Sequence, residues 1–442
     1  KKDPNAAVSE AVEPIIYYLD NGTPEPVRSA LLEGGKWWNQ AFEAAGYKDA
    51  FQLKILPDDA DPMDVRYNVI QWVHRSTRGW SYGASVVDPR SGEILKGHVS
   101  LGSLRIRQDF MIAQALTDSP YAKDDENDDP MLQMALARIR QLSAHEIGHT
   151  LGFTHNFAAS VKERASVMDY PHPTLAIEDG QISYQNAYAV GIGDWDKVTV
   201  KYAYSDFPDG ADETAALNQI LEESYAAGHR FIADRDARPI GGAHPYAHLW
   251  DNGKMVVEEF NHLLAVRQIA MNNFSTDQLK TGEPLSVLRD RLVPLYFLHR
   301  YQLEGVVKLI AGQDYDYGVK GGSSIGVKAV APRVQKEALA TLINSLDQGT
   351  LGIPPHIRKM MPPHAFGYGA SRESFATQTG LTFDALGAAH TLSDAVLSML
   401  LNEQRAARLV QQKAFDEQQL GFKETLTLLI EDSFKQKQYD TE

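Results

Sequence analysis

The 442-residue chain contains no cysteine. Disulfide frameworks, thiol catalysis and cysteine-rich zinc sites are therefore excluded. Basic residues are also in the minority, because 43 Lys and Arg face 58 Asp and Glu, which gives a formal net charge of −15. Since a surface of this sign repels phosphate backbones, we expect no nucleic acid among the partners of this protein.

Long apolar runs are missing as well. No stretch approaches the roughly 18 apolar residues that a membrane-spanning helix needs, so we expect no transmembrane segment. The chain begins with the polar sequence KKDP, and no apolar stretch follows it. We expect a bacterial protein that is exported to the periplasm or the extracellular space, with its signal peptide not present in this chain.

One short segment, residues 145–155 with the sequence HEIGHTLGFTH, is dense in groups that bind metal. On an α-helix His145 and His149 leave the same face, while Glu146 is rotated by about 100° and can face a bound water. Gly152 can take the positive φ that ends a helix, so the chain can turn back and add His155 as a third ligand. Three imidazoles leave one zinc position open for water, as in catalytic sites.

The spacing of this segment is specific. Three histidines, Glu and Gly at these intervals would match by chance in about one such chain in ten thousand. The alternative is an amphipathic helix whose histidines are ordinary surface or core residues. We predict a Zn²⁺ site with His145, His149 and His155 as ligands and Glu146 as general base.

A second segment, residues 166–170 with the sequence SVMDY, is followed by Pro171. Here the chain resembles the metzincin clan of zinc endopeptidases, in which the motif HExxHxxGxxH precedes a tight turn with a methionine beneath the metal. The resemblance implies that Met168 is this Met-turn methionine. It also implies that Tyr170 ligates zinc or stabilises the oxyanion, as in astacin-like and serralysin-like members. A core tyrosine turned away from the metal is the alternative.

The resemblance extends over nearly the whole chain. It is carried by YLDNGTPEP (residues 18–26), WWNQAF (37–42), DPMDVRYN (61–68), RGWSYG (78–83) and AHPYAHLW (243–250). These segments resemble large bacterial zinc metalloproteases that are sometimes called Met-zincins and have no settled substrate. In that family a further N-terminal region usually precedes the catalytic region, so we expect this chain to be the catalytic part of a longer precursor. Asn156 directly follows the third histidine, at a position where metzincin subfamilies differ. This residue does not match a particular subfamily, so the sequence does not assign one.

Strand and helix signals alternate before the zinc motif. Apolar patterns predict strands at residues 14–19, 51–56 and 69–74, and a hairpin of 81–87 and 94–101 around a turn at 88–92. Apolar spacing predicts a helix over 24–45 that stops at Gly46, and Pro130 marks the start of the motif helix. We expect a mixed α+β fold, a metzincin-like catalytic domain with a twisted, mostly parallel sheet and an active-site helix.

Helical signals dominate after about residue 175. Amphipathic helices are predicted at 193–204, 214–228, 255–274, 286–310, 334–346 and, with interruptions, 393–434. We expect a catalytic domain at residues 1–210, divided into an upper subdomain (1–152) and a lower subdomain with the Met-turn (153–210). Residues 211–442 would form a mainly α-helical C-terminal domain that covers or flanks the cleft. Nothing in the sequence indicates the oligomeric state.

Two other clusters have simpler explanations. The acidic run at residues 124–129 offers oxygen ligands for calcium, but we favour a solvated loop that complements the helix N-terminus. His244 and His248 are also four residues apart. No carboxylate directly follows His244, and Pro245 places the pair at a loop or helix start, so we interpret both as structural.

These features together predict a zinc endopeptidase with a peptide or protein substrate. Glu146 would accept the water proton and pass it to the leaving amine, and Tyr170 would help hold the oxyanion. We expect residues 97–104 to form the rim strand on which, by resemblance, the substrate backbone binds. The alternatives are a zinc-stabilised binding or scaffold module without catalysis, against which Glu146 argues, and a zinc hydrolase of a non-peptide amide.

Overall fold

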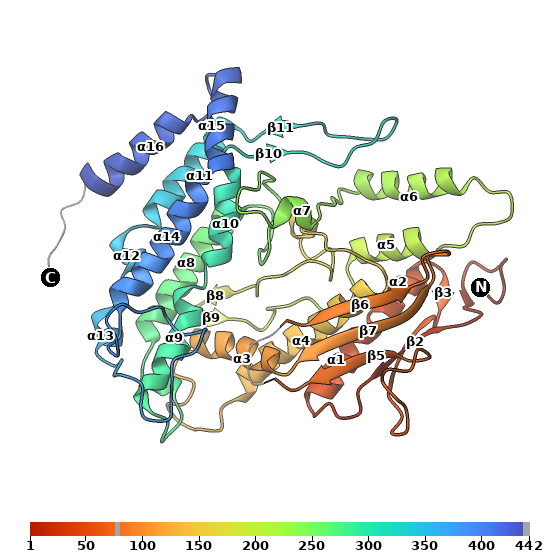
Figure 1. The fold of residues 1–442 in the computed structure, drawn as a ribbon, viewed down its shortest axis with the longest axis horizontal. Helices are drawn as coiled ribbons and strands as arrows, with labels where there is room; N and C mark the ends of the chain where they lie inside the picture. The colour runs from red at the N-terminus through yellow and green to blue at the C-terminus, as the bar shows by residue number, and fades with distance from the viewer. Residues whose placement is uncertain (76–79, 436–442) are drawn as a thin grey trace.

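A five-stranded sheet forms the framework of the N-terminal half in this computed structural model, which describes residues 1–75 and 80–435 (Figure 1). The strand order is β4-β2-β5-β7-β6. All neighbours pair in parallel except β6, which is antiparallel to β7 at one edge. The bounds are β2 (Ile15–Leu19), β4 (Phe51–Ile55), β5 (Asn68–Val73), β6 (Tyr82–Val87) and β7 (Ile94–Gly102). The mostly parallel sheet and the helical second half confirm the predicted α+β fold class.

The hairpin of β6 and β7 corrects one prediction. Its turn closes as expected, with the Asp88 N–H donating to the Glu93 carbonyl at 2.9 Å and Gly92 at φ +78°. The turn folds β6 back along the outer side of β7, so β7 has hydrogen-bonded neighbours on both edges. The predicted rim strand at residues 97–104 is therefore wrong, and β6 is the edge strand on this side of the sheet. Residues 76–79, which include the first two residues of the RGWSYG segment, lie outside the described residues.

Three helices pack with the sheet into one buried core that includes Trp38, Leu142 and Ile147. They are α1 (Val27–Lys36), α2 (Trp38–Ala44) and α4 (Asp129–Thr150). The single helix predicted over 24–45 is thus two helices, and it stops at Gly46 as expected, at φ +88°. A Cβ on Gly34 would lie 2.0 Å from the Arg140 carbonyl oxygen, so this glycine allows α1 to contact α4 closely.

Helix α3 (Leu104–Leu116) was not predicted. Its buried face includes Asp109 and Gln114, and these polar residues interrupt the apolar spacing that identifies an amphipathic helix. Asp109 is buried against Arg105, which bonds its carboxylate at 3.0 Å. Because α3 packs against both α4 and α9, it joins the sheet half to the helical half.

The remaining elements of the first half are short or lie after the metal motif. They are β1 (Ser9–Glu10), β3 (Tyr47–Lys48), a 3₁₀ turn (Ala159–Lys162), β8 (Ala176–Glu178), β9 (Gln181–Ser183), α5 (Asp194–Tyr204) and α6 (Glu213–Ala226).

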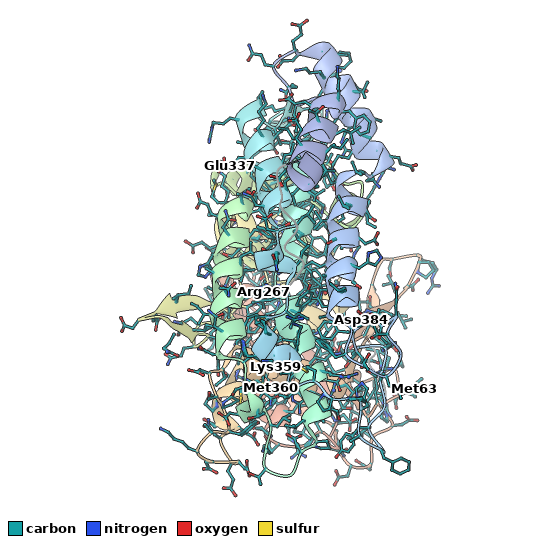
Figure 2. The ribbon with its side chains drawn as sticks, turned by 90° about the vertical axis from the view of Figure 1, so that its left-hand side faces the viewer. Met63, Arg267, Glu337, Lys359, Met360 and Asp384 are labelled. Carbon is teal, nitrogen blue, oxygen red and sulfur yellow. The ribbon has the colours of Figure 1, made fainter. Side chains whose placement is uncertain are left out.

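The C-terminal half is a helical assembly with its own buried core (Figure 2). Helices α8, α11 and α14 pack against α10, and Figure 2 shows Arg267 on α8 and Glu337 on α11. The helices are α7 (Asp234–Ala237), α8 (Val256–Asn273), α9 (Leu288–Tyr296), α10 (Arg300–Leu309), α11 (Pro332–Asn344), α12 (Gln348–Leu351), α13 (Pro355–Arg358), α14 (Ala385–Leu400), α15 (Glu403–Phe415) and α16 (Phe422–Ile430). Short 3₁₀ turns (Thr276–Gln278, Leu285–Val287), a π-helical turn (Glu431–Lys435) and the pair β10 (Gln313–Asp314) and β11 (Lys328–Ala329) complete it.

The helix predicted over residues 286–310 is divided into α9 and α10, with Pro294 inside the last turn of α9. Proline lacks the N–H that continues a helical hydrogen-bond pattern, which favours an end near this point. Across the described ranges, none of the helices is both long enough and apolar enough to cross a bilayer.

Candidate metal centre

Helix α4 ends in the motif that the sequence singled out. Gly152 has φ +96°, its N–H donates to the His149 carbonyl at 3.1 Å, and the Phe153 N–H donates to the Gly148 carbonyl at 3.0 Å. This is the Schellman arrangement that ends a helix with a left-handed glycine. The chain reverses at this point, which brings His155 back toward His149.

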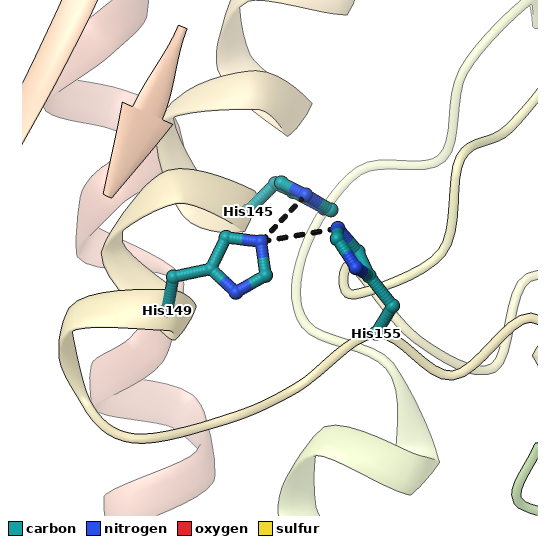
Figure 3. Close-up of side chains that lie close together, drawn as sticks. All are labelled: His145, His149 and His155. Carbon is teal, nitrogen blue, oxygen red and sulfur yellow. Dashed lines mark hydrogen bonds between the residues drawn. The ribbon is translucent and has the colours of Figure 1, made fainter. Parts of the chain in front are cut away.

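The three histidines lie together at this end of α4 (Figure 3). The Nε2 atom of His149 is 3.2 Å from that of His145 and 3.1 Å from that of His155. Nitrogens bound to one tetrahedral zinc at 2.0–2.1 Å would be about 3.3 Å apart. Both of these distances are therefore close to those expected around a zinc ion.

The other nitrogen of each ring, Nδ1, is bonded to an oxygen elsewhere. The pairs are His145 with the Val167 carbonyl (2.7 Å), His149 with the Phe153 carbonyl (2.9 Å) and His155 with the Asp234 carboxylate (2.9 Å). Because these oxygens only accept, Nδ1 carries the proton and Nε2 carries the lone pair. Burial lowers the pKa of all three rings, that of His155 to about 4, so they are neutral at pH 7. Three converging lone pairs are suited to a cation.

Glu146 lies beside this cluster and is 5% exposed. Burial raises the pKa of its carboxyl to about 7, against the opposing charge of Arg138 on the same helix. A carboxyl with this pKa can exchange a proton near neutral pH. Within the described part of the chain, the metal-ligating cluster consists of the three histidines and does not include Glu146.

Met168 is fully buried against the last turns of α4. Its Sδ atom occupies the space at Gly148, where a Cβ would lie 2.2 Å from the sulfur. The turn is held from α5 by Asp196, which accepts from the Ser166 hydroxyl at 2.6 Å and from the Val167 N–H at 2.8 Å. Since the Val167 carbonyl fixes a ligand ring, Asp196 orients both the turn and one side of the cluster.

The ring of Tyr170 packs against the cluster. Its centroid is 4.8 Å from that of His155 and 5.2 Å from that of His145. Its hydroxyl accepts a hydrogen bond from Nη2 of Arg238 at 3.2 Å. Tyr170 therefore lies next to the metal ligands, and its catalytic role stays a prediction.

Sequence reasoning missed Asp234, the first residue of α7, and Arg238, the residue after its end. Arg238 bonds the Asp234 carboxylate as well as the Tyr170 hydroxyl, so a continuous chain of contacts runs from His155 to Tyr170. The Asp-Arg pair at a spacing of four is visible in the sequence. However, 79 residues separate Asp234 from His155, and no local spacing could have connected them.

The other candidate clusters have protein partners. Asp128 in the acidic run bonds the Tyr121 hydroxyl at 2.7 Å and Lys280 Nζ at 2.6 Å. His244 bonds the Tyr315 carbonyl and His248 bonds the Pro245 carbonyl, each at 3.0 Å through Nε2. Among residues 1–75 and 80–435, neither cluster is among the groups of three or more side chains that could hold a metal.

One comparison with known proteins gives a match. A family model described as Met-zincin matches residues 127–440, which is more than half of the chain and includes the three histidines, Met168 and the C-terminal helices. No match was found among curated proteins or among solved structures. On the extent of the family match, this chain belongs to the Met-zincin family.

Proposed function

We propose that this protein is a zinc-dependent endopeptidase. The observation that carries the proposal is the convergence of three Nε2 lone pairs beside the buried carboxyl of Glu146. Membership of the Met-zincin family supports it, because that family suggests a zinc metalloprotease. His145, His149 and His155 would hold the zinc, which supplies a Lewis acid that polarises the scissile carbonyl and lowers the pKa of a water toward about 7.

Glu146 is the general base in this proposal. Its carboxylate takes a proton from the attacking water and then delivers it to the nitrogen of the leaving amine. The raised proton affinity that burial gives this carboxyl suits both steps near neutral pH. A structural zinc site has no use for such a group, so Glu146 is the residue that argues against a non-catalytic module.

Tyr170 and Arg238 would act on the carbonyl oxygen of the substrate. Arg238 donates its N–H to the oxygen of the Tyr170 hydroxyl, so the hydroxyl hydrogen stays free to be donated elsewhere. The developing oxyanion is an acceptor of the right charge for that hydrogen, and preorganised donors of this kind stabilise a transition state. The nearby guanidinium adds positive charge to the same place.

The edge strand β6 is where we place the substrate backbone. Within the described residues β6 pairs only with β7, which leaves its outer edge open to another strand. Gly83 of β6 contacts Glu146 closely, since a Cβ there would be 2.1 Å from the backbone carbonyl oxygen of Glu146, and the Gly83 N–H bonds the carboxyl of the base. An extended peptide added to this edge would pass next to Glu146, as in other cases of strand addition.

The test compares zinc-loaded wild-type protein with Glu146→Ala on peptides from a denatured proteome. New peptide termini should appear with the wild type and not with Glu146→Ala, while Glu417→Ala, at an exposed glutamate, should cleave like the wild type. Equal numbers of new termini from wild type and Glu146→Ala would refute peptide hydrolysis at this site. Export to the periplasm or beyond, and the division into domains at residue 210, stay predictions from the sequence.

A further inference from the structure

A cavity of about 370 Å³ is lined on one side by Trp250, whose ring packs against Tyr170 beside the metal cluster. Its wall comes from α3, from His172 and Pro173 after the Met-turn, from Trp250, and from the facing ends of α9 and α10. Residues 371–374 line one side. The volume is comparable to that of small-molecule and side-chain pockets in enzymes.

Two aromatic rings, those of Trp250 and Tyr170, separate this cavity from the metal ligands. The Trp250 ring, which lines the cavity, is 5.0 Å between centroids from Tyr170, and Tyr170 is 4.8 Å from His155. His172, two residues after Tyr170, lines it as well. A peptide residue extends the chain by at most about 3.6 Å, so a side chain within a few residues of the scissile bond can reach the cavity.

The cavity is rich in arginine although the protein carries a net charge of −15. Arg105 and Arg107 are neutralised by Asp109 and Glu373, each at 3.0 Å. Arg372, a further arginine of the lining, is exposed, and Arg300 differs from all three. It is half-buried, and no carboxylate among residues 1–75 and 80–435 forms a salt bridge with it.

Arg300 is held in place by the neighbouring tyrosine. Its Nη2 donates to the Tyr301 hydroxyl at 3.0 Å, and its guanidinium lies 4.5 Å from the centroid of the Tyr301 ring. The third carboxylate of the cavity, Asp290, accepts from the Ser374 hydroxyl at 3.1 Å and also has the charges of Arg289 and Arg291 nearby. Arg300 therefore has donors available for an incoming anion, in the planar arrangement that binds carboxylates.

Trp250 is fixed as a wall of this cavity in an unusual backbone conformation. Its φ of +63° lies in the left-handed region, which is strained for a tryptophan. Two hydrogen bonds hold it there, from its N–H to the Tyr170 carbonyl and from Gln302 Nε2 to its own carbonyl, both 2.8 Å. Residues strained in this way cluster at ligand clamps and active sites.

We propose that this cavity binds a carboxylate of the peptide substrate, with Arg300 as the residue that recognises it and Trp250 as the wall that positions the chain. The proposal rests on the peptidase function above and names the substrate feature that the same site selects. The carboxylate is an Asp or Glu side chain near the scissile bond or the C-terminal carboxylate of the substrate. The two sources share the chemistry that Arg300 recognises, and the assay separates them.

The experiment uses fluorogenic peptides in which one Glu is moved through the positions on both sides of the cleaved bond. Each peptide has a Gln counterpart, and each is made with a free and with an amidated C-terminus. The kcat/KM values are measured for wild type, Arg300→Gln, Arg300→Lys and the control Arg333→Gln, whose arginine is exposed on α11 and paired with Glu337. Binding of the same peptides to zinc-loaded Glu146→Gln is measured by fluorescence anisotropy, so that recognition is recorded without turnover.

We expect the wild type and Arg333→Gln to prefer Glu over Gln at one position, or a free over an amidated C-terminus, by about 10- to 100-fold. Arg300→Gln should bring that ratio close to one, and Arg300→Lys should keep part of it. The same preference should appear in the binding of Glu146→Gln. Melting temperatures identify any variant that fails to fold, and Arg300→Lys then carries the test.

A wild type that shows no carboxylate preference in cleavage and in binding would overturn the assignment, as would a preference that a folded Arg300→Gln retains. Failure of the proposed function gives a different pattern. In that case no peptide is cleaved by the wild type, whereas the Glu146→Gln protein still reports whether Arg300 selects a carboxylate.

Discussion

The two sides of the metal cluster are built in different ways. His145, Glu146 and His149 lie on one buried helix, and their positions follow from its 3.6-residue period and from the glycine that ends it. His155 and Tyr170 lie on irregular chain after that helix and are supported by Asp234, Arg238 and Trp250 from the second half of the molecule. We call these the helix side and the supported side.

The difference shows what each half of the chain contributes. The positions of the helix side follow from local geometry and from the packing of α4 against the sheet, with the Val167 carbonyl of the Met-turn fixing the ring of His145. The supported side depends on contacts between residues about 70 to 80 positions apart, such as Asp234 with His155 and Arg238 with Tyr170. Substitutions on the helix side should therefore abolish zinc binding or peptide cleavage. Substitutions of the residues that support His155 and Tyr170 should only weaken these functions.

The largest effect should come from a ligand on the helix side. His149→Ala removes the nitrogen that lies within 3.2 Å of both other Nε2 atoms, so zinc binding and peptide cleavage should both be lost. Zinc content after gel filtration and cleavage of a fluorogenic peptide measure the two losses. His356→Ala, at an exposed histidine, should retain both. Full zinc content in His149→Ala would show that the three-histidine assignment is wrong.

The next effect should come from the base, which separates chemistry from metal binding. Glu146→Gln should lower kcat by about 10²–10⁴-fold while the zinc content stays at that of the wild type. The reason is that Glu146 lies beside the cluster and outside its set of ligands. If this variant lost zinc as readily as His149→Ala, Glu146 would be a ligand and the comparison of the two sides would need revision.

The helix side was also the part that the sequence could predict. The strands β2, β4, β5, β6 and β7, the start of α4 near Pro130 and the turn at Gly152 all follow from local patterns of residues, and the structure confirms them. The identity of the edge strand could not be predicted in the same way. Whether β6 or β7 is outermost depends on which side the hairpin folds toward, and the apolar pattern of the two strands does not contain this information.

The supported side shows where sequence reasoning reached its limit. Tyr170 could be identified because it lies two residues after Met168 in a recognisable turn. Asp234 and Arg238 could not, because their partners are far away in the sequence and their own neighbours form no motif. Trp250 ends the segment AHPYAHLW, which carries the resemblance but does not indicate that its ring packs against Tyr170. Helix α3 was missed for a related reason, since its buried Asp109 is satisfied by Arg105 and reads as a surface residue.

On the supported side, the largest change should follow Tyr170→Phe. Removing the hydroxyl deletes one donor to the oxyanion, which in other enzymes costs about 10²–10³ in kcat, with little change in KM because the interaction forms as charge develops. Steady-state kinetics measure both constants, with the exposed Tyr368→Phe as a control. An unchanged kcat would leave Tyr170 as a packing residue.

A smaller effect should follow the loss of the support for His155. Asp234→Asn keeps the shape but removes the charge that orients the ring through Nδ1, so the zinc dissociation constant should rise by about 10- to 100-fold. Competition with a fluorescent chelator measures this constant, and Asp209→Asn, at an exposed aspartate, serves as a control. Zinc affinity equal to that of the wild type would mean that His155 is positioned by the backbone alone.

The smallest effect should be a loss of stability at acid pH in the helical core of the C-terminal half, which lies next to the supported side. His299 is fully buried against Phe260, and neither of its ring nitrogens has a hydrogen-bond partner in the part of the chain that the structure describes. Burial lowers the pKa of this histidine to about 3, and the charges of Arg267 and Arg300 act in the same direction.

The sign of the resulting pH dependence follows from these pKa values. The unfolded chain takes up a proton near pH 6.5 and the folded chain does not, so the free energy of unfolding falls as the pH drops below 6.5, by about 1.4 kcal/mol per unit until the folded pKa is reached. Between pH 7 and pH 5 the loss amounts to about 2 kcal/mol. His299→Leu should lack this part of the acid sensitivity, which urea denaturation at the two pH values measures, with the exposed His356→Leu as a control.

The place where acid lowers the free energy of unfolding tests the comparison between the helix side and the supported side. His299 immediately precedes α10, and Gln302 on α10 bonds the Trp250 carbonyl, which leads to Tyr170 and the supported side. Amide exchange at pH 5, corrected for intrinsic rates, should therefore accelerate in α8 and α10 and at Trp250 relative to His299→Leu, while α4 stays protected to the same extent in both. If acid loosened α4 as early as α10, the two sides of the metal cluster would unfold as one unit, and the division between local and long-range support would not extend to stability.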